Sequence, residues 1–101
     1  MNTAAKMPEH KQTQVIQSWH EPALRTLSSF LEVRKANLRK INRDESNAAV
    51  TRDELIEALS RDHRISYQDA GMIISSLHRC EEIIMFGWFI QMNERGGEVN
   101  V

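Results

Sequence analysis

The sequence predicts a mainly α-helical fold with a short C-terminal β-hairpin: a long N-terminal helix, two short helices, then the hairpin. Three observations predict it. Apolar residues recur at helical spacing between residues 24 and 41. Thr51 and Ser66 each stand three residues before an acid, which is the spacing of a helix N-terminus. Residues 83–90 are β-branched and aromatic around a glycine, which favours strands and a turn.

The composition describes one small domain with balanced charge. The chain has 101 residues, of which 41% are hydrophobic, and it carries 13 basic and 14 acidic side chains. Proteins that coat nucleic acid without regard to sequence carry a clear positive excess, so any such binding must come from a local basic surface. We expect a flexible N-terminal arm at 1–14, a single domain at 15–93 and a flexible tail at 94–101.

The cysteine and hydropathy patterns predict a soluble protein of a reducing compartment. Cys80 is the one cysteine, so no disulfide can form within the chain, and we expect this thiol in the core of a cytoplasmic protein. Residues 1–15 lack the apolar run of a secretory signal. The most apolar stretch, 83–90, is far shorter than the roughly 20 residues of a membrane helix. We therefore expect neither secretion nor a membrane partner.

The first helix is expected from about Ser18 to residue 43. Ser18 and Glu21 have capping-box spacing, and Pro22 suits a first turn. Its apolar residues fall in an arc about 120° wide, which predicts one buried face. They are Leu24, Leu27, Phe30, Leu31, Leu38 and Ile41.

Arg34 lies in the middle of that apolar arc. A buried guanidinium without a partner is costly. Three explanations are open: the side chain pairs with an acid, it extends past the edge of the core, or a partner uses this helix face.

The second and third helices each have a clear start. Thr51 and Glu54 form a capping box, and Ser66 and Asp69 repeat its spacing. The buried face of the second helix holds Leu55, Ile56, Ala58 and Leu59. The buried face of the third holds Ala70, Ile73, Ile74, Leu77 and Cys80. Only residues 62–65 separate the two helices, which is the spacing of a helix-turn-helix.

The segment after Glu82 is predicted to form a hairpin with strands near 83–86 and 88–92. Gly87 can adopt a turn conformation that is closed to other residues. A continued helix is the competing interpretation.

The hairpin carries more apolar side chains than one face can bury. Alternation along a strand separates Met85 and Phe89 from Phe86, Trp88 and Ile90. A small domain rarely covers both faces of a hairpin, so we expect one row to be exposed as a dimer or partner contact. The candidate partner-binding residues are Met85, Phe86, Trp88 and Phe89.

Residues 51–92 resemble a winged helix-turn-helix domain. The resemblance is carried by TRDELIEAL at 51–59, ISYQDA at 65–70, Ile73 to Leu77, and the segments at 82–84 and 87–90. It covers about half of the chain and includes no family-specific motif. It implies that the helix at 66–80 lies in the major groove of duplex DNA. The hairpin is very short, which leaves little wing to reach a minor groove.

The resemblance implies two sets of nucleic-acid-binding residues. Gln68, Ser75, His78 and Arg79 would read bases, since glutamine pairs well with adenine and arginine with guanine. Lys35, Arg39, Arg43, Arg61 and Arg64 would hold the DNA backbone. The alternative is an ordinary solvated face, because Asp69 and Glu82 near the edges of the third helix repel phosphate.

Residues 34–43 hold five basic side chains and no acid. Arg25, Lys35, Arg39 and Arg43 line one side of the predicted helix. This basic ridge can bind phosphates or an acidic protein surface. Equally, cations at a helix C-terminus complement the helix dipole.

No pattern in the sequence predicts catalysis, a cofactor or a metal site. The chain has no glycine-rich phosphate loop, nucleophile elbow or His-Glu-x-x-His run, and its histidines are scattered. We therefore predict a non-enzymatic protein without a small-molecule substrate. The first hypothesis is a dimeric, DNA-binding transcription regulator. The second is a phage- or plasmid-type accessory or inhibitor protein that binds a host protein through residues 83–92 and the basic ridge.

Overall fold

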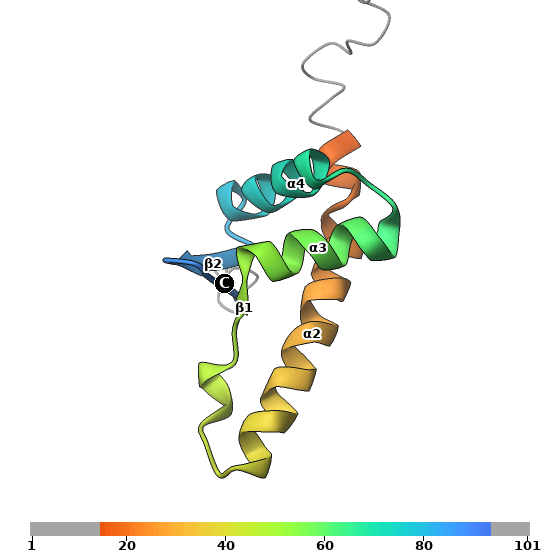
Figure 1. The fold of residues 1–101 in the computed structure, drawn as a ribbon. Coiled ribbons are helices and arrows are strands. Elements are labelled where there is room, and N and C mark those ends of the chain that lie inside the picture. Colours follow the sequence, from red (N-terminus) through yellow and green to blue (C-terminus); the bar gives the residue numbers. More distant parts are fainter. Residues whose placement is uncertain (1–14, 94–101) are drawn as a thin grey trace, which may run out of the picture.

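The computed structural model describes residues 15–93. The predicted arm at 1–14 and tail at 94–101 lie outside these residues. The elements, in chain order, are α2 (His20–Lys40), the 3-10 turn η2 (Glu45–Asn47), β1 (Val50–Thr51), α3 (Arg52–His63), α4 (Tyr67–Arg79), β2 (Ile83–Phe86) and β3 (Phe89–Met92). The fold is mainly helical with a small antiparallel sheet, and α4 lies beside α3 while α2 crosses them (Figure 1).

The start of α2 differs from its prediction. Ser18 does not cap this helix, because its hydroxyl donates a hydrogen bond to the carbonyl of Val15 at 2.6 Å. Trp19 occupies the N-cap without a side-chain hydrogen bond. Residues 15–18 are already helical, so α2 continues from a preceding helical turn. The capping box that the spacing of Ser18 and Glu21 predicts is therefore wrong.

α2 also ends earlier than predicted, at Lys40. Asn42 adopts the left-handed conformation with φ 60° and donates its backbone N–H to Arg39 O. The N–H of Arg43 donates to Leu38 O at 2.8 Å, which completes a Schellman motif. Because the helix stops here, Ile41 leaves the buried face and is 62% exposed.

Both predicted caps of the paired helices are confirmed. Thr51 Oγ1 accepts from the N–H of Glu54, whose carboxylate accepts from the N–H of Thr51 at 2.9 Å. Ser66 Oγ accepts from the N–H of Asp69 at 3.0 Å. Residues 64–66 connect the two helices, with Arg64 in the left-handed conformation. The hydroxyl of Ser60 donates to Ile65 O and holds the connection.

The core lies between the three helices and one face of the sheet. From the helices it takes Ala23, Leu27, Leu31, Leu55, Leu59, Ala70, Ile73, Ile74 and Leu77, and from the remainder Ala48, Val50, Ile83 and Ile90. Leu24, Phe30 and Leu38 pack against it half-buried. Cys80 is exposed, which corrects the expectation of a core thiol, because α4 ends at Arg79 and the chain turns away.

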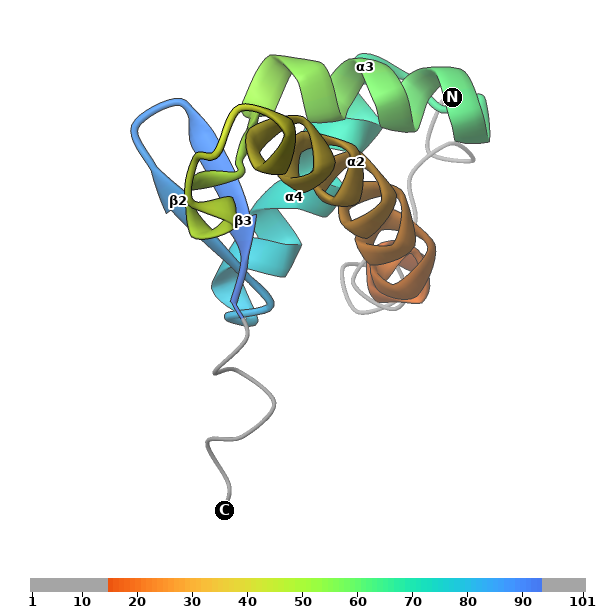
Figure 2. The same ribbon diagram turned by 90° about the horizontal axis from the view of Figure 1, so that it is seen from below.

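The predicted hairpin is confirmed, and the continued helix is wrong. β2 and β3 pair antiparallel, with Phe86 opposite Phe89 across the turn. Gly87 takes φ +61° at the first turn position, a backbone conformation that favours glycine. The sequence analysis missed β1, which pairs with β3 and makes the strand order β1-β3-β2. Figure 2 shows the hairpin standing to one side of the helices.

The two faces of the hairpin differ from the predicted alternation. Ile83 and Ile90 are buried, with Met85 half-buried beside them, while Phe86 and Phe89 are exposed. The turn makes Phe86 and Phe89 cross-strand partners, and cross-strand partners share a face. Counting alternation straight through the turn was therefore wrong. The expected exposed apolar row exists, but Met85 does not belong to it.

No helix among residues 15–93 is long and apolar enough to span a membrane.

Candidate nucleic-acid interface

α4 presents an exposed, mostly polar stripe on the side opposite the core, with one methionine in it. At about 100° per residue, Gln68, Met72, Ser75 and Arg79 fall within about 60° of one another. All four side chains are exposed. The stripe is free to face outward because Ile73, Ile74 and Leu77 on the opposite side of the helix pack into the core. The structure thus brings three of the four predicted base-reading residues onto one line.

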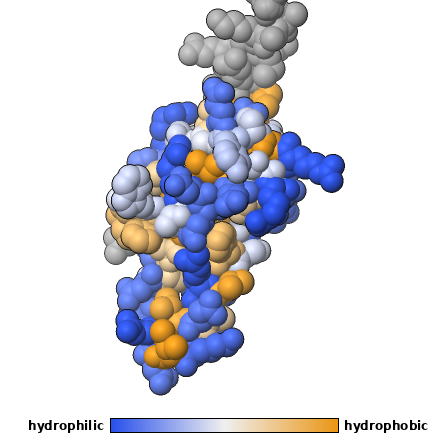
Figure 3. Space-filling model, in the orientation of Figure 1, coloured by the Kyte–Doolittle hydropathy of each residue, from blue (hydrophilic) through white to orange (hydrophobic). Residues whose placement is uncertain are grey.

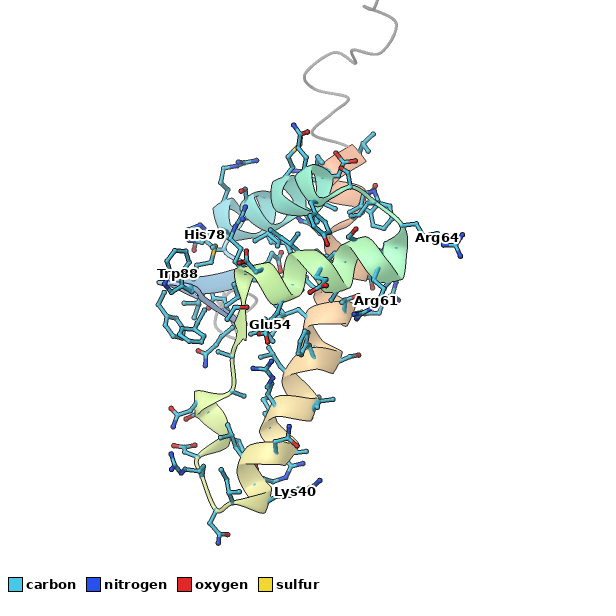
Figure 4. The ribbon with its side chains drawn as sticks, in the orientation of Figure 1. Lys40, Glu54, Arg61, Arg64, His78 and Trp88 are labelled. Atoms are coloured by element: carbon cyan, nitrogen blue, oxygen red, sulfur yellow. The ribbon has the colours of Figure 1, made fainter. Side chains whose placement is uncertain are left out.

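His78 stands apart from that stripe. It is exposed but lies about 60° further round the helix than Ser75. In Figure 4, His78 lies at the end of α4 near the hairpin, on the same side of the molecule as Trp88.

A shallow groove of about 470 Å³ runs between α3 and α4 along the stripe. Its lining consists of Arg52, Ile56, Tyr67, Gln68, Gly71, Met72 and Ser75. Arg52 supplies a cation that was not predicted for this surface. One feature of the sequence could have pointed to Arg52: it stands at the first position of a helix, where the positive end of the helix dipole disfavours a cation. A second feature was Gly71, because glycine is unfavourable in the interior of a helix.

The first half of α3 exposes two acidic side chains. Asp53 and Glu57 lie four residues apart on this helix, and both are exposed. Their carboxylates repel phosphate. An anionic polymer therefore has an unfavourable approach across this part of α3.

The basic ridge is partly neutralised by ion pairs. Lys35 Nζ lies 3.5 Å from Glu32, and Arg39 Nη1 lies 2.9 Å from Glu45. Arg43 belongs to the loop after α2, so it does not continue the line of the helix. These exposed pairs contribute little to stability, but they reduce the positive potential of the ridge.

The predicted backbone-binding residues lie in two separate regions. Arg61 and Arg64 stand at the end of α3, where Arg61 pairs with Asp62 at 3.2 Å and Arg64 points away from the helices. Lys40 marks the far end of α2, well away from both (Figure 4). One flat basic surface is therefore not formed, and only Arg61 and Arg64 lie close in sequence to the start of α4.

Arg34 is explained by an acid, the first of the three possibilities. Its Nη2 lies 2.6 Å from Glu54 Oε2, its Nη1 donates to Ala49 O, and its guanidinium stacks 5.0 Å over the Phe30 ring. The hydrogen bond from the N–H of Thr51, together with Arg34, lowers the pKa of Glu54 below its ordinary value, against the effect of burial. Arg34 thus ties α2 to the cap of α3.

The hairpin presents an exposed aromatic surface, which we define as Phe86, Trp88 and Phe89. Trp88 at the turn is 77% exposed, and the two phenylalanine rings lie 6.1 Å apart. Figure 3 shows hydrophobic colour on the hairpin side and near the lower end of α2. Between these two places lies a cleft of about 390 Å³, which Phe86 and Phe89 line together with Leu38 and Ile41.

The titratable side chains of residues 15–93 form no group of three histidine, cysteine or acidic residues that could hold a metal ion. His20 and His63 make hydrogen bonds instead, with Ser76 at 2.8 Å and with Thr26 at 3.0 Å.

The chain matches no model of a known protein family, no curated protein and no solved structure. Its function is therefore inferred from the arrangement of its own residues.

Proposed function

We propose that this protein is a small DNA-binding regulator with a winged helix-turn-helix architecture, in which α4 enters the major groove of duplex DNA. The observation that carries the proposal is the exposed polar stripe of α4, with the Arg52 guanidinium beside it. A major groove about 12 Å wide admits a helix whose exposed side chains reach base edges.

The order of elements supports the architecture. A long helix precedes two short helices that are joined by residues 64–66, and an antiparallel hairpin follows. β1 adds a third strand to the hairpin, so that the small sheet closes one side of the helices. The two-residue turn leaves a short wing, with Trp88 at its end.

The proposed roles follow from position. Gln68 and Arg79 lie on the crest of α4, where an amide can pair with adenine and a guanidinium with guanine, and Ser75 lies between them. Arg61 and Arg64, next to the start of α4, hold the DNA backbone. A homodimer would present two such helices to neighbouring half-sites. The protein then works in the cytoplasm, where the exposed Cys80 thiol stays reduced.

Binding to DNA is tested with a short mixed-sequence duplex. We expect measurable affinity at low salt. The logarithm of the association constant should fall linearly with the logarithm of the salt concentration, with a slope of about −0.9 per phosphate contact. Arg79→Ala should weaken binding, whereas Lys40→Ala, at the far end of α2, should not. Absence of binding by the wild type at low salt would contradict the proposal.

A second candidate function is favoured by one specific observation, the hairpin surface beside the cleft. We propose as the alternative an accessory or inhibitor protein whose host partner inserts an apolar side chain into this cleft. Lys40 and Arg43 flank Ile41 of the cleft lining in sequence, so the partner segment should also carry carboxylates. Lys35, Arg39 and Arg43 suit this candidate better than the first, because they lie towards the end of α2 that is remote from α4.

This alternative is tested by replacing Trp88, which is 77% exposed. Trp88→Ala should abolish partner capture while the thermal unfolding transition stays unchanged. Tyr67→Ala is the matched control, because Tyr67 is an aromatic side chain of α4 that is 62% exposed. Capture that survives Trp88→Ala would show that Trp88 is not part of the contact. Capture that is lost equally with Tyr67→Ala would show that the loss is not specific to the hairpin.

A further inference from the structure

Gly71 is a buried glycine in the interior of α4. Glycine is less favourable than alanine in a helix interior, so its presence needs a reason. A Cβ at position 71 would lie 3.1 Å from Nη2 of Arg52, tighter than ordinary van der Waals contact. Gly71 therefore leaves the space that the Arg52 guanidinium occupies.

The position of Arg52 is unfavourable for a cation in the folded protein. It is the first residue of α3, at the positive end of the helix dipole. Its backbone N–H donates to Trp88 O at 2.9 Å, but its guanidinium has no hydrogen bond or ion pair with residues 15–93. The side chain is nevertheless half-buried, lying across α4 beside Gln68 and Ser75. A half-buried cation without a hydrogen bond or ion pair among residues 15–93, beside the proposed DNA surface, is suited to an anionic ligand.

We propose that Arg52 binds a backbone phosphate of duplex DNA, and that Gly71 is a positioning residue that gives its guanidinium room. This inference rests on the proposed DNA-binding function and adds a contact to it. Arg52 lies in the groove between the helices and below the crest of α4, so it meets the strand that borders the major groove. The planar guanidinium binds phosphate through two parallel hydrogen bonds.

The first test removes the guanidinium and measures binding to the mixed-sequence duplex over a range of salt concentrations. Arg52→Ala should lower affinity about tenfold at low salt and reduce the magnitude of the salt slope by about 0.9, the value for one phosphate. Arg52→Lys should keep the slope and lose part of the affinity, because lysine keeps the charge without the fork. Lys40→Ala removes the same charge at the remote end of α2 and should change neither quantity.

The second test uses Gly71→Ala, for which stability and binding should move in opposite directions. Alanine favours the helix, so the melting temperature should equal or exceed that of the wild type. The added methyl group pushes the guanidinium a few tenths of an ångström from its position beside the groove, so DNA affinity should fall. In the Arg52→Ala background, Gly71→Ala should cause no further loss of affinity, because the two residues act through one contact.

The outcomes separate this inference from the function on which it rests. A wild-type protein that fails to bind the duplex overturns the DNA-binding function, and the phosphate contact with it. Wild-type binding with an unchanged salt slope in Arg52→Ala overturns the contact alone. An additive effect of Gly71→Ala in the Arg52→Ala background overturns the positioning role, since the glycine would then act independently of Arg52.

Discussion

At the scale of single residues, the carboxylate of Glu54 takes part in two hydrogen bonds, one within the cap of α3 and one to α2. Its carboxylate accepts from the N–H of Thr51 at 2.9 Å and from Arg34 at 2.6 Å. One side chain thus completes the cap of α3 and holds α2 against it. Because both side chains of the ion pair are about one third exposed, solvent screens the pair and its net contribution is modest.

Glu54→Gln should separate these two roles, because glutamine can still complete a capping box but cannot pair with Arg34 as an anion. We expect a loss of about 1 kcal/mol in the free energy of unfolding near neutral pH. Folding lowers the pKa of Glu54. The stabilisation is therefore complete above the ordinary glutamate pKa of about 4.3 and disappears as the pH falls through the lower folded value.

Urea unfolding of the wild type and Glu54→Gln at neutral and at acid pH measures this difference. Glu57→Gln is the control, since Glu57 is an exposed carboxylate of the same helix. A difference between wild type and Glu54→Gln that persists unchanged in acid would show that the ionised pair is not its source.

At the scale of elements, α2, α3 and α4 each end on a residue other than glycine in the left-handed conformation. Asn42, Arg64 and Glu81 have φ values of 60°, 57° and 60°. After α4, the N–H groups of Glu81 and Glu82 donate to His78 O and Leu77 O, as in a Schellman motif. Glycine usually occupies this position because a Cβ is disfavoured there.

Glu81→Gly should therefore stabilise the protein, by about 0.5–1 kcal/mol. The melting temperature should rise, and the size of the rise measures the strain at this position. Glu82→Gly removes a carboxylate one residue later, where φ is negative, and should not stabilise. Equal effects of the two substitutions would point to charge as the cause.

At the hairpin turn the native residue is already glycine, so its replacement should destabilise the protein. Gly87 has φ +61°, and a Cβ there would meet no atom within 4 Å. Any cost of Gly87→Ala must therefore come from backbone strain, which we expect to be about 1 kcal/mol. Gly87→Asn should cost less, since asparagine tolerates the left-handed region. Thermal unfolding of both variants tests this, and an equal loss in both would argue against backbone strain.

At the scale of the whole molecule, the segment between α2 and α3 is bound to the sheet in two ways. β1 pairs with β3 through Val50 and Ile90, and Gln91 donates its side-chain amide to the carbonyls of Ser46 and Ala48 at 2.9 and 2.7 Å. Asp44 caps η2 by accepting from the N–H of Ser46, a hydrogen bond that lowers the pKa of Asp44. The segment thus packs along β3, although it contains little regular structure.

Gln91→Ala should release this segment without unfolding the molecule. Two backbone carbonyls lose their donor, so we expect amide hydrogen exchange to accelerate in residues 44–49 and to stay unchanged in α4. Asn93, which also donates an amide to a carbonyl, is the matched control through Asn93→Ala. Faster exchange throughout the chain would indicate a global loss of stability in place of local release.

Local features of the fold were predictable because their interactions span few residues. Thr51 and Ser66 each cap a helix through a residue three positions later. The periodicity of α4 identified Ala70, Ile73, Ile74 and Leu77 as buried, and Gly87 located the turn. The predictions of Ser18 as a cap and of Cys80 as a core residue were wrong because neighbouring structure changes their positions. Ser18 lies in a turn that is already helical, and Cys80 falls just past the end of α4.

For the candidate site, the sequence alone determined that Gln68, Ser75 and Arg79 of α4 face outward, because helical geometry fixes their directions from the buried stripe. Tertiary structure decided the rest. Arg34 meets Glu54 across 20 residues, Gln91 meets Ser46 across 45, and Arg52 lies over Gly71 on a different helix. Such contacts depend on how elements pack, and a periodic pattern specifies which face of a helix is buried without specifying which residue of another element it meets.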